Sequence, residues 1–191
     1  MQKRMDMEKA LSQMSKEEKL QELADYLPCR HERQYVSRYI QALRQDDSEQ
    51  VSWFESFGQS IRHVMLNVST YERGKLFGYA DKRFDEYGWI RGMLPIVENI
   101  ELDTANVIHI GQSVNGQYAV TVSWGTSNAG GGSYPSVWDE PIADYKEAVS
   151  CGIRMLEQQY AKMSSKETSR LMAGLRELKQ KHTGPQQLTL L

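Results

Sequence analysis

The sequence predicts an α+β protein that is mainly helical, with a short antiparallel β-hairpin between N-terminal helices and two C-terminal helices. Two observations support this fold class. Apolar residues recur at helical spacing as far as Val68 and again after Pro141. Between these regions, two β-prone stretches flank Asn115-Gly116, a residue pair that favours the type I′ turn of a hairpin.

Three helices are expected in the N-terminal part. Ser15 and Glu18 have the spacing of a capping box, and Pro28 ends the helix that follows. A second helix begins near Arg30, and Asp47 caps a third. The apolar positions of the three helices are Leu20, Leu23 and Leu27, then Tyr35, Val36, Tyr39, Ile40 and Leu43, then Val51, Phe54, Phe57, Ile61, Val64, Met65 and Val68.

Residues 69–103 are rich in both aromatic residues and glycine, and two interpretations stay open: a helix near 83–91, or an irregular connector. Core aromatics beneath a solvated charged surface are favoured here over a ligand site. The residues that would line such a site are Asp81, Lys82, Arg83, Asp85, Glu86 and Trp89.

The hairpin strands are expected at 106–110 and 117–124, where apolar and small or polar residues alternate in the second strand. The glycine-rich segment 125–135 should be a mobile loop. A helix then begins after Asp139 and Pro141. A last helix opens at 164–167 and places Leu171, Leu175 and Leu178 on its inner face.

Three regions are therefore predicted. Residues 1–100 form a helical region. Residues 101–182 form the hairpin with two helices, which we expect to pack with the first region as one domain. Residues 183–191 form a flexible C-terminal tail, because Gly184-Pro185 ends the preceding helix.

Composition restricts the class of partner. The net charge of −2 over 191 residues argues against a protein that binds nucleic acid over its whole surface. Residues 154–182 hold seven Lys and Arg against three Glu, so weak contact with phosphates is one interpretation and a solvated helix surface is the favoured one. We expect a cytoplasmic protein with no membrane contact, because no long apolar run and no secretory signal are visible.

No catalytic, metal-binding or cofactor-binding residue can be nominated. Cys29 and Cys151 are far apart and are expected to be free thiols. The histidines have no paired metal spacing and form no obvious triad with serine, cysteine or carboxylate residues. They are His31, His63, His109 and His182. The sequence thus leaves open whether the protein catalyses a reaction, and it favours a protein that is not an enzyme.

The segment Gln187-Leu188-Thr189-Leu190-Leu191 resembles the short peptides with which bacterial DNA polymerases and repair factors dock onto the sliding clamp. The resemblance implies a partner-binding role for Gln187, Leu188, Leu190 and Leu191. The leucines would fill apolar pockets, and the Gln187 amide would fix the register. The alternative is that these leucines fold back onto the body of the protein.

A second resemblance concerns residues 117–160, which are similar to a small α/β module of phage and plasmid proteins that accompany DNA methylases or partition-type proteins. The residues that carry it are Tyr118–Trp124, Gly130–Ser133, Pro135–Trp138 and Glu140-Pro141. No activity is attached to that module. The resemblance implies a role connected with mobile DNA.

The favoured hypothesis is a non-enzymatic accessory protein of DNA replication or mobile-element maintenance that docks to a sliding clamp. One alternative is a small enzyme or ligand-binding domain with a groove beside Gly130, Gly131, Gly132 and Ser133. These residues lack the Gly-Lys-Ser/Thr ending of a phosphate-binding P-loop. Another alternative is a helical regulator that acts as a dimer. The sequence leaves the oligomeric state open.

Overall fold

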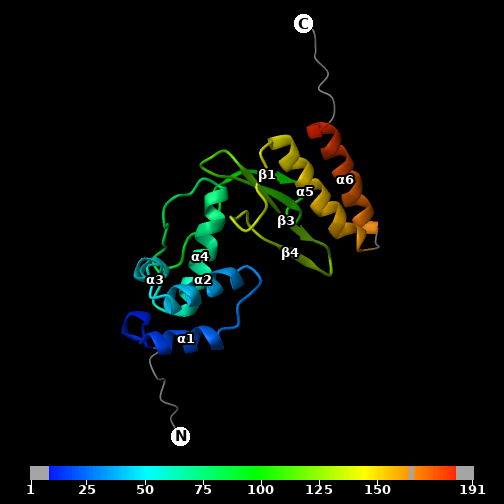
Figure 1. The fold of residues 1–191 in the computed structure, drawn as a ribbon. Coiled ribbons are helices and arrows are strands. Elements are labelled where there is room, and N and C mark those ends of the chain that lie inside the picture. Colours follow the sequence, from blue (N-terminus) through cyan, green and yellow to red (C-terminus); the bar gives the residue numbers. More distant parts are fainter. Residues whose placement is uncertain (1–8, 164–165, 184–191) are drawn as a thin grey trace. The chain divides into compact units, whose positions relative to one another are not determined.

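The computed structural model describes residues 9–163 and 166–183 (Figure 1). The described chain is α+β, with six α-helices and a four-stranded antiparallel sheet. It divides into two compact units. The helical unit contains the described residues up to Arg73 together with Ala80–Arg91, and the sheet unit contains Gly74–Tyr79 and the described residues from Gly92 onward.

The helical unit begins with a short 3-10 helix, η1 (Leu11–Gln13), followed by α1 (Lys16–Asp25), α2 (Arg33–Arg44), α3 (Ser48–Glu55) and α4 (Ile61–Leu76). The last residues of α4 belong to the sheet unit. The capping box at the start of α1 is present, since Ser15 accepts a hydrogen bond from the Glu18 N–H and Glu18 accepts one from the Ser15 N–H.

The apolar run that predicted a single third helix forms two helices, α3 and α4. The chain turns between them at Gly58, where a Cβ atom would lie 2.4 Å from the Cβ of His63. Only a glycine permits this close approach. The core of the helical unit contains Leu11, Leu23, Tyr35, Val36, Tyr39, Leu43, Phe54, Phe57, Ile61, Val64, Met65, Val68 and Ile90.

Residues 80–91 form an irregular connector with one isolated β-bridge between Phe84 and Ile90, so the helix that was one option there is absent. The buried side chain of Asn67 on α4 holds this connector. Its amide nitrogen donates to the carbonyls of Phe57 and Gly88 at 2.7 and 2.8 Å, and its oxygen accepts from the Ile90 N–H at 2.8 Å.

The sheet unit contains β1 (Ile96–Glu101), β2 (Val107–Gln112), β3 (Tyr118–Gly125) and β4 (Gly130–Gly132), in that spatial order. The expected hairpin therefore corresponds to the central pair of a larger sheet. Strand β1 was not predicted, because a bulge between Ile96 and Glu98 interrupts the alternation of its side chains between the two faces. Three successive glycines carry no strand signal, yet they pair with Ser123, Trp124 and Gly125 instead of forming a loop.

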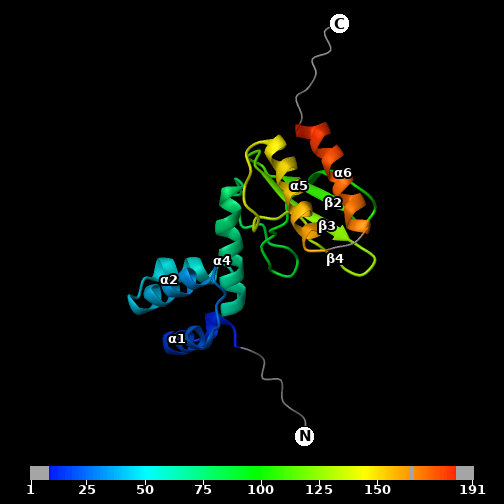
Figure 2. The ribbon, with the colours of Figure 1, turned by 90° about the vertical axis from the view of Figure 1, so that its right-hand side faces the viewer.

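Helices α5 (Tyr145–Ala161) and α6 (Lys166–Thr183) cover one face of the sheet (Figures 1 and 2). Asp144 caps α5, whereas Asp139, the predicted cap, accepts a hydrogen bond from the Ser136 N–H. A Cβ atom on Gly152 of α5 would lie 2.3 Å from Cγ2 of Ile108, so α5 packs very closely on β2. The core on this side contains Ile100, Ile108, Ile110, Val120, Val122, Ala148, Val149, Ile153, Leu156, Tyr160, Leu171 and Leu175.

The opposite face of the sheet is divided into two parts. A small apolar cluster covers one end, around Ala119 on β3. It contains Phe77, Tyr79, Leu94, Ala119 and Val137. The other end carries polar side chains from β1, β2 and β3, and it adjoins the glycines of β4. The polar side chains at this end are the candidates for a functional site in the sheet unit.

Candidate functional site

Three neighbouring strands bring an asparagine, a histidine and a serine together. His109 on β2 lies opposite Asn99 on β1 and opposite Thr121 on β3, and Ser123 lies two residues further along β3. Because side chains on a strand alternate between the two faces, all four point to the face that α5 and α6 leave uncovered. The register of the three strands thus brings together residues that are distant in the sequence.

The three side chains form a continuous chain of hydrogen bonds. Nδ1 of His109 lies 2.7 Å from Oδ1 of Asn99, and Nε2 lies 2.8 Å from Oγ of Ser123. We refer to Asn99, His109 and Ser123 as the polar relay. His109 is buried, with 8% of its surface exposed, whereas Ser123 is half-buried and Asn99 is exposed.

Hydrogen-bond chemistry fixes the protons in the relay. An amide oxygen can only accept, so Nδ1 of His109 carries the proton that is donated to Asn99. In a neutral imidazole, Nε2 is then an acceptor and receives the Ser123 hydroxyl proton. Burial lowers the pKa of His109, which favours this neutral form.

The backbone of Gly132 on β4 packs closely against the Ser123 hydroxyl. A Cβ atom on Gly132 would lie 2.5 Å from Oγ of Ser123, so only glycine permits this approach. Nearby, Oγ1 of Thr121 donates to the carbonyl of Ser133 at 2.7 Å and fixes the end of β4. The exposed ring of Tyr134 lies 5.3 Å from the His109 ring, measured between centroids.

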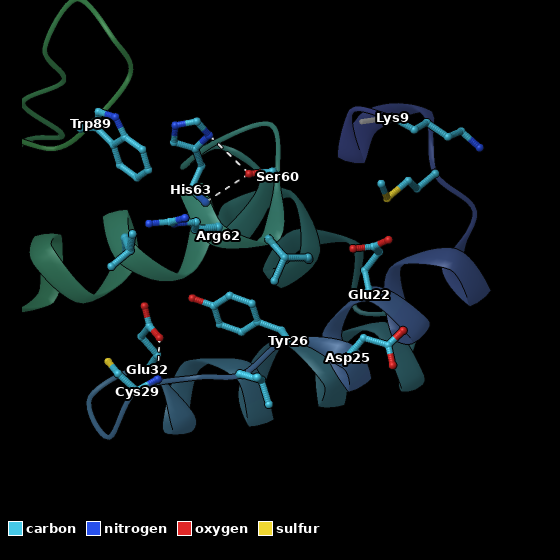
Figure 3. A pocket seen from close by; sticks show the side chains of 14 residues that line it. Lys9, Glu22, Asp25, Tyr26, Cys29, Glu32, Ser60, Arg62, His63 and Trp89 are labelled. Carbon is cyan, nitrogen blue, oxygen red and sulfur yellow. Dashed lines mark hydrogen bonds between the residues drawn. The ribbon is translucent and has the colours of Figure 1, made fainter. Parts of the chain in front are cut away.

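A second candidate site is a cavity of about 980 Å³ in the helical unit (Figure 3). Figure 3 shows the hydroxyl of Tyr26 and the side chain of Arg62 directed into the same opening. His63 and Trp89 contact each other beside it, with ring centroids 4.0 Å apart and ring planes inclined by 42°. Glu32 is 3% exposed, and its carboxylate accepts a hydrogen bond from the Cys29 N–H at 2.8 Å.

The charges around this cavity are mixed. Burial and then the nearby carboxylate of Glu32 raise the pKa of Tyr26 to about 12, so its phenol stays protonated at neutral pH. Carboxylates of Glu22 and Asp25 line the cavity together with the cations of Lys9 and Arg62. Because acidic and basic side chains line the cavity in comparable number, it favours neither an anionic nor a cationic ligand. The cavity has the volume of a small-molecule site without defining a ligand.

The sequence-predicted sites differ in what the structure describes. Gly130, Gly131 and Gly132 form β4, and Ser133 follows them beside the relay. Gln187, Leu188, Leu190 and Leu191 lie outside the described residues. Within residues 154–182, the Lys and Arg side chains that the structure describes are exposed on α5, on α6 or at the end of α5. They are Arg154, Lys162, Arg170, Arg176, Lys179 and Lys181.

Phe84 and Tyr87 of the 80–91 connector line a cavity of about 480 Å³, but none of the six residues that were considered for a ligand site lines it. Asp85 accepts hydrogen bonds from the N–H groups of Tyr87 and Trp89, both at 2.9 Å, which is the chemistry of a turn. The ammonium of Lys82 lies 4.0 Å from the centroid of the Phe57 ring. Of these residues, Trp89 alone lines the large cavity.

Sequence reasoning missed the polar relay. His109 and Ser123 lie in the two predicted strands, and pairing across Asn115-Gly116 would have placed them on one face. Asn99 could not be added, because its strand carried no recognisable pattern. Within the described ranges, no group of three or more His, Cys, Asp or Glu side chains is placed to hold a metal ion.

Comparisons with known proteins add no family to this description. No protein-family model, no curated protein and no solved structure matches the chain. Across the helices that the structure describes, none combines the length and the apolar character that crossing a membrane requires.

Proposed function

We propose that this protein is an accessory factor of DNA replication or mobile-element maintenance that docks onto a sliding clamp. The observation that carries the proposal is the peptide Gln187-Leu188-Thr189-Leu190-Leu191. Its glutamine and spaced leucines match the pattern with which replication and repair factors bind that ring. The docking role does not depend on whether the sheet unit also performs a reaction.

Peptide binding of this kind has a simple physical basis. An extended segment places alternate side chains on the same side, so Leu188 and Leu190 can enter neighbouring apolar pockets while Gln187 fixes the register by hydrogen bonds. Gly184-Pro185 interrupts the helical pattern just before the peptide. A contact made by only five residues gives modest affinity, in the region of about 1 μM or weaker.

A weak contact with DNA would add to such binding. Lys179 and Lys181 are exposed on α6 and precede the peptide by only a few residues. A clamp encircles duplex DNA, so cations close to the docking peptide would lie near phosphates. Binding to a DNA-loaded clamp should then weaken with salt more steeply than binding to the free clamp.

The experiment titrates the full chain with a purified bacterial sliding clamp and measures the binding by calorimetry. We expect saturable binding that the double variant Gln187→Ala, Leu190→Ala weakens at least about tenfold, since it removes the register contact and one apolar anchor. The matched control is Gln186→Ala, Thr189→Ala, which alters two neighbouring residues outside the anchoring positions and should bind like the unmodified chain.

Two outcomes would overturn the proposal. One is the absence of saturable binding at clamp concentrations of about 100 μM, well above the expected dissociation constant. The other is equal binding by the double variant and the control, which would mean that contact with the clamp uses a different surface.

A further inference from the structure

We propose that Ser123 is a nucleophile for acyl transfer, that His109 is its general base, and that Asn99 positions His109. The proposal rests on geometry. The nucleophile and base are in hydrogen-bond contact at 2.8 Å, and the base and the positioning residue are in contact at 2.7 Å. These are the two contacts that define an activated serine, whatever the fold that carries it.

The direction of each hydrogen bond suits this role. The amide oxygen of Asn99 holds the proton of His109 on Nδ1 and keeps the Nε2 lone pair directed at Ser123. Burial disfavours the charged imidazole, so the base is ready to accept a proton at neutral pH. The exposed tip of Asn99 and the half-buried Ser123 keep the relay within reach of solvent and of a substrate.

The surroundings of Ser123 favour an apolar acyl group. Gly132 packs against one side of the Ser123 hydroxyl, where a Cβ atom would lie 2.5 Å from Oγ, so a substrate must approach from another side. The exposed ring of Tyr134, with 58% of its surface accessible, offers an apolar contact next to His109. An ester or thioester with a short or aromatic acyl group would pack against this ring.

The reaction balances without a cofactor. The oxygen of Ser123 attacks the substrate carbonyl carbon while its proton passes to Nε2 of His109. The tetrahedral intermediate collapses, the bond to the leaving alcohol or thiol breaks, and that group takes the proton from Nε2. Water then attacks the acyl-serine, gives one proton to Nε2 and releases the acid, and the proton returns to Ser123.

The competing explanation is that Asn99 and Ser123 only satisfy the hydrogen-bonding groups of the buried His109. It predicts a contribution to folding and no unusual reactivity of Ser123. An activated serine instead reacts covalently with an electrophile that ordinary serines ignore. A fluorophosphonate probe makes this distinction, because the serine oxygen displaces fluoride from phosphorus and leaves a stable adduct.

The experiment incubates the folded, full-length chain with an alkyl fluorophosphonate and records intact mass and peptide maps. We expect one adduct, on Ser123, which is absent in Ser123→Ala. The matched control is Ser133→Ala, which removes a neighbouring exposed serine and should label at the unmodified rate. His109→Ala should label at least about a hundredfold more slowly, the range that a general base contributes.

The positioning role of Asn99 has a separate readout. Asn99→Ala should slow labelling about tenfold or more while lowering the free energy of unfolding by less than about 1 kcal/mol, because the residue is exposed. Asn99→Asp, which still accepts the Nδ1 proton, should restore labelling. Since Asn99→Ala is expected to stay folded, the test does not depend on the stability of His109→Ala.

Labelling of Ser123 that is no faster than that of other serines would overturn the proposal, as would labelling that is unchanged by loss of His109 or Asn99. These outcomes are independent of clamp docking. The chain with Gln187→Ala and Leu190→Ala should carry the adduct at the unmodified rate, so failure of one proposal leaves the other intact.

Discussion

Two buried polar side chains, Asn67 in the helical unit and His109 in the sheet unit, are satisfied in opposite ways. Asn67 makes three hydrogen bonds, all to backbone groups, and is 1% exposed. His109 makes two, both to side chains, one of which is a hydroxyl. The difference separates a residue that fixes the chain path from one that can move a proton.

The physical reason lies in what each partner can do. Backbone amides and carbonyls neither titrate nor change orientation, so the bonds of Asn67 determine a structure and nothing else. A histidine between an amide oxygen and a hydroxyl has a fixed tautomer and a polarised partner oxygen. Burial therefore predicts a stability effect at Asn67 and a reactivity effect at His109.

The largest expected effect is loss of stability in Asn67→Ala. The substitution leaves the buried Phe57 carbonyl and the Ile90 N–H without their partner, at about 1–3 kcal/mol for each, and it also removes the bond to the carbonyl of the exposed Gly88. We expect the free energy of unfolding to fall by about 3 kcal/mol or more in urea titrations. Asn99→Ala, the matched change in the relay, should cost less than about 1 kcal/mol. Equal losses would remove the distinction between the two residues.

Two glycines allow the same comparison between an effect on stability and an effect on reactivity. Gly152→Ala drives a methyl group against the buried Ile108, so overpacking of about 1–3 kcal/mol should exceed the helix-propensity gain of about 1 kcal/mol. Gly132→Ala places its methyl group against Oγ of the half-buried Ser123, on an exposed edge strand. There we expect a stability change below about 1 kcal/mol, together with strongly reduced fluorophosphonate labelling.

Urea unfolding and adduct formation measure both glycine variants. Ala129→Gly, a change at the exposed residue just before β4, provides a control for altered backbone freedom near the strand. If Gly132→Ala labelled normally, the close approach of Gly132 to the Ser123 hydroxyl would have no role in the reactivity of Ser123. If Gly152→Ala were stabilising, α5 would have room to move away from β2.

The sequence predicted the elements with strong local signals and missed those that depend on pairing. Ser15 with Glu18 and the turn at Asn115-Gly116 are local chemistry, so the start of α1 and the connection between β2 and β3 followed directly. Strand β1 carries a bulge, and β4 is all glycine, so neither shows an alternating pattern. Both strands exist because a partner strand supplies their hydrogen bonds.

The candidate site was hidden for the same reason. Asn99, His109 and Ser123 have no characteristic spacing along the chain, and their proximity results from the register of three strands. The sequence predicted the glycines as a mobile loop, whereas Gly130–Gly132 form β4. Their sequence alone could not reveal that Gly132 lies against the Ser123 hydroxyl, because that contact requires the pairing of β4 with β3.

The smallest expected effect is a pH dependence of stability from His109. Its pKa is lowered in the folded chain by burial, below the ordinary value of 6.5, so the unfolded chain binds the proton more readily. The contribution of His109 to stability is therefore fully present above about pH 6.5 and is lost as the pH falls through the folded pKa. Asn67 cannot titrate and adds no such slope.

The groups that face His109 set the sign of this effect. Asn99 and Ser123 are uncharged, and the ring of Tyr134 contacts His109 from the open side. Glu101 shares the face of β1 with Asn99, and because its carboxylate is exposed, solvent screens its attraction for an imidazolium. Burial should therefore dominate, as the direction of the pKa shift indicates.

The measurement is urea unfolding of the unmodified chain and of His109→Gln between pH 5 and 8, with an NMR titration of the His109 ring. The difference between the two unfolding curves isolates His109 from the other histidines, and it should narrow as the pH falls. Labelling of Ser123 should decline over the same range, because a protonated imidazole cannot accept the serine proton. A His109 pKa at or above 6.5 would contradict both the stability slope and the assignment of His109 as a base poised at neutral pH.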